Sequence, residues 1–405
     1  MTGAMYAAIA GLKTHMTKMS VIGNNIANVN TNGYKSQRTI FKDAMYTMYS
    51  GGSDGTSTTA GKNPSQIGYG SQVSSIDLNM STGSFAPGNS TDCMIYGDGF
   101  FLLGDKDTAN VIDPLNPASM KSLSLSRVGD FSFKADGYLS DGNGSVVYGF
   151  LVTGTDPETG KPTVSDQLVP IRLPKMESSV EMVEGENGEL VPTGKISYEV
   201  KYPSAGIDEE GGYKTALKDY VPALPEDAEE GAEPAELPFA QLDGVSIAPT
   251  TGAITGTTKD TDELITIGYI AIGNVTNPNG VTHTGGFYYN AGAGAGDLQV
   301  SLLGGVAADL GISYVNGELM AGAKAQLEEM GAGEDMDLEN LAQSDKMLIG
   351  SAGGTNLMTG GLEGSNVDLA NEIADMITTQ RGYQANTRII TVTDAMLEEL
   401  VNMKR

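Results

Sequence analysis

Apolar side chains near the start of the chain recur at spacings of three and four residues. The stripe that they form consists of Met5, Ile9, Leu12, Met16, Met19, Ile22, Ile26 and Val29. This spacing places the side chains on one face of a helix and has the heptad geometry of a coiled coil. The stripe ends in the Asn-rich and Gly-containing segment 28–33, residue types that terminate helices in the left-handed conformation. We therefore predict an amphipathic helix that ends near residue 30.

A second stripe, more polar than the first, follows near the other end of the chain. Ser365 offers a capping hydroxyl with Asp368 three residues later, a spacing that satisfies the first amides of a helix. The apolar positions after this cap are Leu369, Ile373, Met376, Tyr383, Ile390 and Leu397, and Gln380, Thr387 and Asp394 recur beside them every seven residues. We predict a long C-terminal helix with a half-polar seam.

The two predicted helices differ in the sign of their charge. Residues 1–45 carry basic side chains against Asp43 alone, whereas the C-terminal helix is mainly acidic. Opposite charges favour pairing. We expect the two stripes to pack against each other as a coiled coil and against neighbouring copies of the chain, and we take them together as the predicted assembly interface.

The middle of the chain favours β structure. Its 405 residues include 54 glycines, few aromatic residues and no Trp, and short runs such as Phe131–Phe133 and Val146–Tyr148 alternate with Gly, Asn and Asp turns. The predicted fold is mainly β, with nested β-sandwich or barrel-like domains inserted between N- and C-terminal helices. In order, we predict a terminal helical domain of 1–30 and 365–405, linkers at 31–70 and 350–364, an inner β domain of 71–165 and 240–300, an outer acidic β domain of 166–239, and an insertion at 301–349 that the pattern does not place.

Composition excludes several functions. The formal net charge of -27 disfavours binding to nucleic acid or to anionic lipid. Cys93 has no cysteine partner, and with only His15 and His283 available it does not suggest a metal site, so we interpret Cys93 as a small buried side chain. No apolar run suggests membrane insertion or a cleaved signal peptide.

Motifs for catalysis or cofactors fail on inspection. Gly154–Lys161 has the wrong spacing for a phosphate loop, Gly292–Asp297 misplaces a glycine of the dinucleotide fingerprint, and Asp141–Gly144 lacks the later ligands of a calcium loop. Neither histidine lies near a recognisable nucleophile motif. We expect no cofactor and no enzymatic activity.

Segments at both ends resemble the signatures of flagellar rod and hook proteins. Residues 22–35 closely resemble the N-terminal signature of this family, and residues 362–369 with 376–386 look like its C-terminal signature. The matching positions are Asn24, Asn25, Asn28, Asn30, Thr31 and Gly33 at one end, and Ser365, Asn366, Val367, Asp368, Gln380, Arg381, Tyr383 and Asn386 at the other. Segments 95–101, 127–131 and 136–139 resemble the first β domain of the hook-type members, and segment 271–281 looks like the returning half of that domain.

The resemblance implies a structural subunit of the flagellar hook, which polymerises into a curved tube and acts as a universal joint for motor torque. It also implies export through the flagellar type III apparatus to an extracellular location, and contacts with rod, hook cap and hook-filament junction proteins. Two alternatives stay open. One is a distal rod protein of the same family, and the other is a secreted β-rich adhesin or hydrolase.

Overall fold

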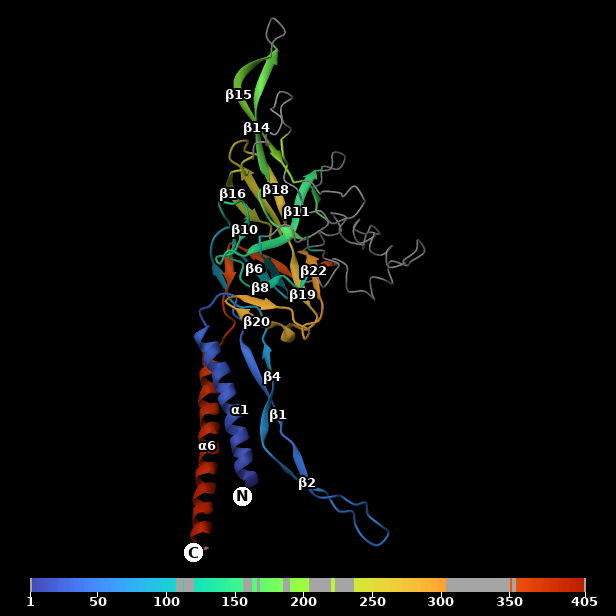
Figure 1. The fold of residues 1–405 in the computed structure, drawn as a ribbon, viewed down its shortest axis with the longest axis vertical. Helices are drawn as coiled ribbons and strands as arrows, with labels where there is room; N and C mark the ends of the chain where they lie inside the picture. The colour runs from blue at the N-terminus through green and yellow to red at the C-terminus, as the bar shows by residue number, and fades with distance from the viewer. Residues whose placement is uncertain are drawn as a thin grey trace, which may run out of the picture. The chain divides into compact units, whose positions relative to one another are not determined.

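The structure is a computed structural model that describes residues 2–106, 112, 120–155, 162–165, 168–184, 190–203, 220–222, 237–303, 350–351 and 355–403. The chain divides into two compact units (Figure 1). Unit 1 comprises Met1–Gly83 and Gly364–Arg405, and unit 2 comprises Ser84–Glu363. The predicted class is confirmed, because helices at both ends flank a part of the chain that is mainly β.

Two long helices form one side of unit 1. They are α1 (Thr2–Ala27) and α6 (Leu369–Asn402), and they lie side by side with the two ends of the chain at the same end of the pair (Figure 1). After α1 the chain turns through Gly33, whose φ of 69° lies in the left-handed region that the sequence predicted for this segment. Because both ends of the chain lie at the same end of the pair, the two helices run antiparallel.

The cap of α6 differs from the prediction. Asp368 is the N-cap, and its carboxylate accepts hydrogen bonds from the amides of Ala370 and Asn371. The Ser365 hydroxyl instead accepts from the amide of Val367 in the preceding turn. Aspartate and serine cap helices about equally well, so residue type alone does not decide which of the two is the cap. The position of the first helical turn decides between them.

Strands complete unit 1 where we predicted a linker at 31–70. β1 (Gln37–Asp43) pairs antiparallel with β4 (Ser71–Leu78), and β2 (Tyr46–Ser50) pairs antiparallel with β3 (Ser65–Gly68). We call Ala44–Tyr69, which contains β2 and β3, the ribbon (Figure 1). The Gly- and Ser-rich segment 51–62 lies at its tip. Pairing of β1 with β4 also places residues 71–78 in unit 1, although the sequence assigned them to the inner β domain.

Unit 2 is built from short strands. The largest sheet among the described residues has 15 strands. Its main path has the order β16-β17-β18-β11-β7-β19-β22-β23, and the remaining strands of the sheet pair at the sides of this path. The strands are β5 (Phe85–Pro87), β6 (Cys93–Tyr96), β7 (Phe100–Gly104), β8 (Ser124–Ser126), β9 (Ser132–Phe133), β10 (Leu139–Ser140), β11 (Val146–Thr155), β12 (Pro162–Val164), β13 (Val169–Pro170), β14 (Lys175–Glu184), β15 (Leu190–Lys201), β16 (Leu242–Ile247), β17 (Ala253–Thr258), β18 (Leu264–Ile270), β19 (Ile272–Val275), β20 (Thr282–Gly285), β21 (Tyr288–Asn290), β22 (Leu298–Leu302), β23 (Gly350–Ser351), β24 (Asn356–Thr359) and β25 (Gly361–Glu363), with one 3-10 turn, η1 (Pro278–Gly280).

The core of unit 2 unites residues that are distant in sequence. Phe101, Phe131 and Ile272 are among its fully buried members, and the rings of Phe101 and Phe131 pack edge to face at 5.0 Å. Cys93 lies in this core as predicted, with none of its surface exposed, and burial raises the pKa of its thiol. A Cβ at residue 129 would lie 1.9 Å from the Cys93 carbonyl oxygen, so glycine is required there.

The return segment at 350–364 is also structured, although the sequence predicted a linker. β24 pairs with β6 and β25 pairs with β5, both antiparallel. In the predicted outer acidic domain, β14 and β15 form a two-stranded sheet, and most of the remaining positions lie outside the described residues. Of the predicted insertion 301–349, only residues 301–303 are described, and β22 includes the first two of them.

Candidate assembly interface

The contact between α1 and α6 uses small and polar side chains. Gly11 faces Asn386, and a Cβ at residue 11 would lie 2.6 Å from the amide nitrogen of that side chain. Gly382 likewise faces the His15 ring, since a Cβ there would lie 2.8 Å from its Cε1 atom. Lys18 forms an ion pair with Asp375 at 2.9 Å. The two glycines let the helix backbones approach closely.

On α6 the less exposed positions recur every three or four residues. They are Glu372, Met376, Thr379, Gly382, Asn386, Ile390, Thr393 and Leu397, the spacing of a seam toward a partner helix. The seam is half polar, as predicted, but its polar members are not the predicted ones. Gln380, Thr387 and Asp394 are exposed, each one position after a seam residue.

The predicted stripe on α1 lies beside this contact. Ile22 is buried, Met5, Leu12, Met19, Ile26 and Val29 are half-buried, and Ile9 and Met16 are exposed. The buried residues of α1 are instead Ala8, Gly11, Thr14, Val21, Ile22 and Asn25. On α6, Met376, Ile390 and Leu397 are half-buried, whereas Leu369, Ile373 and Tyr383 are exposed. Within one chain, therefore, the two predicted stripes do not form a closed apolar seam.

Another side of α1 is covered by the β1–β4 pair. The Thr14 and Ser71 hydroxyls are 3.1 Å apart and share a hydrogen bond, and the His15 ring lies edge to face with Phe41 at 6.4 Å. Gly70, with a φ of 103°, lies so close to Ala7 that a Cβ there would be 2.9 Å from the Ala7 carbonyl oxygen. The apolar spacing within the helix does not predict this packing, because the strands that provide it follow the helix in the sequence.

The N-terminal signature residue Asn25 binds the β1 backbone as a neighbouring strand would. Its Nδ2 donates to the Gln37 carbonyl at 2.9 Å, and the Gln37 amide donates to its Oδ1 at 3.0 Å. The Tyr34 hydroxyl also donates to Asn25 Oδ1, and Asn24 donates to that hydroxyl. Finally, Asn25 Nδ2 donates to Glu372 Oε1 on α6 at 2.9 Å. Asn25 therefore joins α1, β1 and α6.

The C-terminal signature residue Asn366 has the matching role. Its Oδ1 accepts from the Ser36 amide at 2.7 Å, and its Nδ2 donates to the carbonyls of Asn79 and Ser81 at 2.8 and 3.0 Å. Lys35 is buried and donates to the same Ser81 carbonyl at 2.9 Å. We call Asn25, Tyr34, Lys35 and Asn366 the polar lock, because they hold both ends of the chain on one strand pair.

Among the other signature residues, Asn386 lies in the α6 seam, and several more are turn-forming or exposed. Asn28 donates to the Asn24 carbonyl and accepts from the Thr31 hydroxyl, which closes the turn after α1. Asn30, Gln380 and Arg381 are exposed. The sequence pattern singled out both kinds without separating them.

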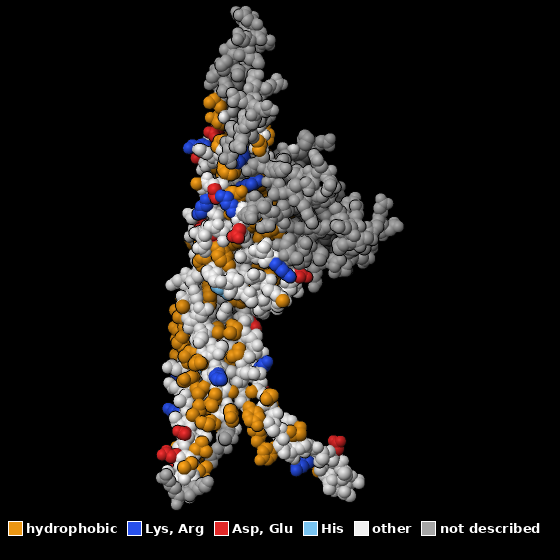
Figure 2. Space-filling view, in the orientation of Figure 1, with side chains coloured by type: hydrophobic (Ala, Val, Ile, Leu, Met, Phe, Trp, Pro, Cys, Tyr) orange, Lys and Arg blue, Asp and Glu red, His pale blue; other side chains and the backbone are white. Residues whose placement is uncertain are grey.

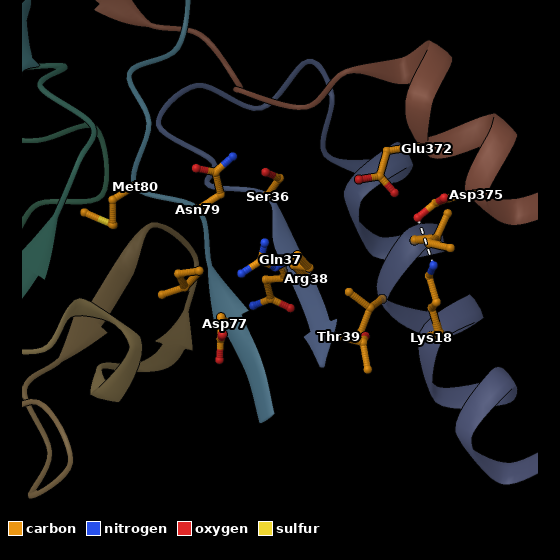
Figure 3. A pocket seen from close by; sticks show the side chains of 13 residues that line it. Lys18, Ser36, Gln37, Arg38, Thr39, Asp77, Asn79, Met80, Glu372 and Asp375 are labelled. Carbon is orange, nitrogen blue, oxygen red and sulfur yellow. Dashed lines mark ion pairs between the residues drawn. The ribbon is translucent and has the colours of Figure 1, made fainter. Parts of the chain in front are cut away.

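A pocket of about 550 Å³ lies beside the polar lock, between α1, α6 and the β1–β4 pair (Figure 3). Lys18, Arg38, Asp77, Glu372 and Asp375 are its charged lining residues. Burial raises the pKa of the Glu372 carboxyl, and the nearby Asp375 raises it further, while Asn25 and Lys18 act in the opposite direction. Charged side chains of both signs therefore line the pocket.

Unit 1 also exposes large apolar side chains. On the ribbon these are Met45, Tyr46, Met48, Tyr49, Ile67 and Tyr69, and Figure 2 shows hydrophobic side chains along it. On α6 they include Ile377, Ile389, Val392, Met396 and Leu400. Apolar surface of this extent is typical of protein–protein contacts.

Other kinds of site find little support among the described residues. They contain no group of three or more His, Cys, Asp or Glu side chains placed to hold a metal ion. In the same part of the chain, no helix is long and apolar enough to cross a membrane.

The two ends of the chain fold together around the polar lock, and the exposed apolar side chains of unit 1 are suited to contacts with other protein chains. The family described as "Flagella basal body rod protein" matches residues 5–35, and the family described as "Flagellar basal body rod FlgEFG protein C-terminal" matches residues 358–403. These segments contain Asn25 and Asn366, respectively.

Known flagellar proteins are similar along the full length of the chain. The flagellar hook protein FlgE of Borreliella burgdorferi is 28% identical over 476 residues, which cover all of both chains. The flagellar basal-body rod protein FlgG of Bacillus subtilis is 27% identical over 406 residues, again covering all of both. FlgE of Salmonella typhimurium is 28% identical over 437 residues, covering 98% of this chain and 99% of that one. The two matched family models and these similarities along the full length support a flagellar rod or hook protein.

Proposed function

We propose that this chain is the structural subunit of the flagellar hook. Its copies polymerise through unit 1 into a curved helical tube, which acts as a universal joint between motor and filament. The observation that carries the proposal is the large apolar surface that both helices and the ribbon of unit 1 leave exposed, including Met16 on α1 (57% exposed), Ile373 on α6 (45%) and Tyr49 on the ribbon (79%).

Unit 1 uses different side chains for contacts within the chain and for the proposed contacts between copies, and this supports the proposal. Asn25, Lys18 and the close approach at Gly11 hold α1 against α6, and these contacts use few of the large apolar residues. The apolar residues are therefore left for contacts between copies, where burial contributes about 25 cal/mol per Å². A head-to-tail contact that does not close into a ring continues as a helical tube.

The choice between hook and rod rests on the relatives. Several full-length relatives are hook proteins, which favours the hook. Chain length does not separate the two, because the rod protein FlgG of Bacillus subtilis aligns over its whole length with the whole of this chain. Electron microscopy of basal structures from cells lacking the chain decides between them. A complete rod without a hook is expected, whereas a truncated rod would identify a distal rod protein.

The partners follow from the same proposal. The chain contacts further copies of itself and, at the two ends of the tube, flagellar rod, hook cap and hook-filament junction proteins. It leaves the cell through the flagellar type III export apparatus without cleavage of its N-terminus and resides in the extracellular hook. Mass spectrometry of the N-terminal peptide from isolated hooks tests the absence of cleavage.

We also propose that the chain is not an enzyme, since its relatives are structural subunits. The alternative of a secreted hydrolase or adhesin predicts activity of the isolated chain. Screening of purified protein for hydrolysis of glycans, esters and peptides separates these classes, and turnover in any screen would contradict the proposal.

A further inference from the structure

Among the methionines whose side chains the structure describes, most of the exposed ones lie in unit 1. The exposed methionines of unit 1 are Met45 (81% exposed), Met403 (76%), Met48 (61%), Met16 (57%) and Met396 (52%), which we call the thioether set. In unit 2 the described methionines Met94, Met120 and Met176 are 1%, 2% and 4% exposed, and Met358 is 39% exposed. Thioethers therefore lie on the surfaces that the proposed function buries between copies.

Two members of the thioether set lie on the ribbon. Tyr46 pairs with Gly68 and Met48 with Gln66, so Met48 and Tyr46 share one face of β2. Tyr49 lies where the pairing register shifts between Met48 and Ser50, and Met45 directly precedes the strand. All four side chains are exposed, so a dissolved oxidant can reach each sulfur atom in the unassembled chain.

Oxidation would change the chemistry of these side chains. A hydroperoxide transfers one oxygen atom to the thioether sulfur, the O–O bond breaks, an S–O bond forms, and the peroxide leaves as water or an alcohol. Sulfur loses two electrons and the peroxide gains them. The product, methionine sulfoxide, is polar and is reversed by methionine sulfoxide reductases. A polar group buried without a hydrogen-bond partner opposes association.

We propose that the thioether set is a reversible oxidation site that controls the entry of subunits into the tube. The inference rests on the proposed function, because burial between copies is what makes the sulfoxide unfavourable. In the unassembled chain hydroperoxides oxidise these five methionines before Met94, Met120 and Met176. The oxidised chain keeps its fold but does not polymerise, while a chain already in the tube is protected.

The test uses the full chain and hydrogen peroxide. Peptide mass spectrometry maps sulfoxide in unassembled and assembled protein, and sedimentation measures the critical concentration for tube formation. We expect oxidation of the thioether set to raise the critical concentration by at least about tenfold, equivalent to about 1.4 kcal/mol per subunit. Treatment with methionine sulfoxide reductases should restore the original value.

Two variants make the test specific. Leucine conserves the volume of methionine, so the variant with all five methionines of the thioether set changed to leucine should assemble with or without peroxide. The matched variant M94L/M120L/M176L should remain as sensitive as the original chain. Tubes that form equally well from fully oxidised protein, or a thioether-set variant that remains sensitive, would overturn the inference alone. Failure of the untreated chain to form tubes would contradict the proposed function and this inference with it.

Discussion

The Ser36 amide donates to Asn366 Oδ1 across 2.7 Å, although the two residues lie 330 positions apart in the chain. The Nδ2 atom of the same asparagine donates to the Asn79 and Ser81 carbonyls. One side chain thus fixes the segment before α6 to the strand pair that follows α1. This contact shows how residues from both ends of the sequence build one unit.

Replacement of Asn366 by alanine should loosen unit 1. It removes three hydrogen bonds to backbone groups, and we expect the free energy of unfolding of this unit to fall by about 1 to 3 kcal/mol. Hydrogen exchange of the α1 and α6 amides measures the change. The control is Asn30→Ala, at an exposed signature position. Equal exchange in both variants would contradict the role of Asn366.

Glycines in the two helices should respond in opposite ways. Gly382→Leu places a side chain where the His15 ring lies, so α6 is expected to separate from α1. At Gly23 a Cβ meets nothing within 4 Å, and Gly23→Ala should stabilise α1 by about 0.5 to 1 kcal/mol through helix propensity. Thermal unfolding followed by circular dichroism tests both. A neutral Gly382→Leu would show that the close approach does not hold the helices together.

The Glu372 carboxyl should make unit 1 less stable as pH rises. Burial raises its pKa above the ordinary value of 4.5, so the folded state holds this proton more tightly than the unfolded state does. The contribution of this carboxyl to the free energy of unfolding is then greatest below pH 4.5 and declines as pH rises through the folded pKa. Glu372→Gln removes this decline, so the variant should gain stability relative to the original chain as pH rises from about 4 to 7. A difference independent of pH would contradict the assignment.

The ion pair between Arg127 and Glu363 should be a sensitive point of unit 2. Both side chains are fully buried with 3.9 Å between Nη1 and Oε2, and Arg127 also donates to the Ile95 and Gly97 carbonyls. Burial lowers the pKa of the guanidinium, and Glu363 opposes this effect. Glu363→Gln leaves a buried positive charge without its counter-ion. We therefore expect the free energy of unfolding, measured by chemical denaturation, to fall by about 3 to 5 kcal/mol.

The matched control for this pair is an exposed one. Lys106 and Asp136 lie 2.8 Å apart with side chains 55% and 44% exposed, and Lys106→Ala should change the free energy of unfolding little, because solvent screens the pair. Equal effects of the two substitutions would show that burial does not govern the strength of the Arg127–Glu363 pair.

The sequence predicted the two terminal helices and the β-rich middle because their signals are local. The stripe from Met5 to Val29 and the cap before Leu369 lie within a few turns of the residues they specify. Recognition of the family was likewise confirmed, because both signatures are contiguous in sequence.

Which face of each helix contacts the other could not be predicted from apolar spacing. The contact depends on Gly11 and Gly382, which permit close approach, and on Asn25, which binds a strand and a helix at once. A periodicity of large apolar residues does not detect these features. A search for small and polar residues at the same spacing would have found Ala8, Gly11 and Asn25. The strands at 37–78 were missed because each pairs across a loop rather than with a neighbouring apolar run.

The most direct test of assembly through unit 1 is electron microscopy of tubes formed by purified Met16→Asp and Ile373→Asp chains. Both side chains are exposed in the single chain, so each variant should keep the circular dichroism and melting of the original. Ile22→Asp is the contrasting control. That side chain is buried within the chain, so the substitution should unfold unit 1 itself. We expect folded subunits and no tubes from Met16→Asp and Ile373→Asp. Normal tubes from both variants would contradict the claim that these apolar faces form the assembly interface.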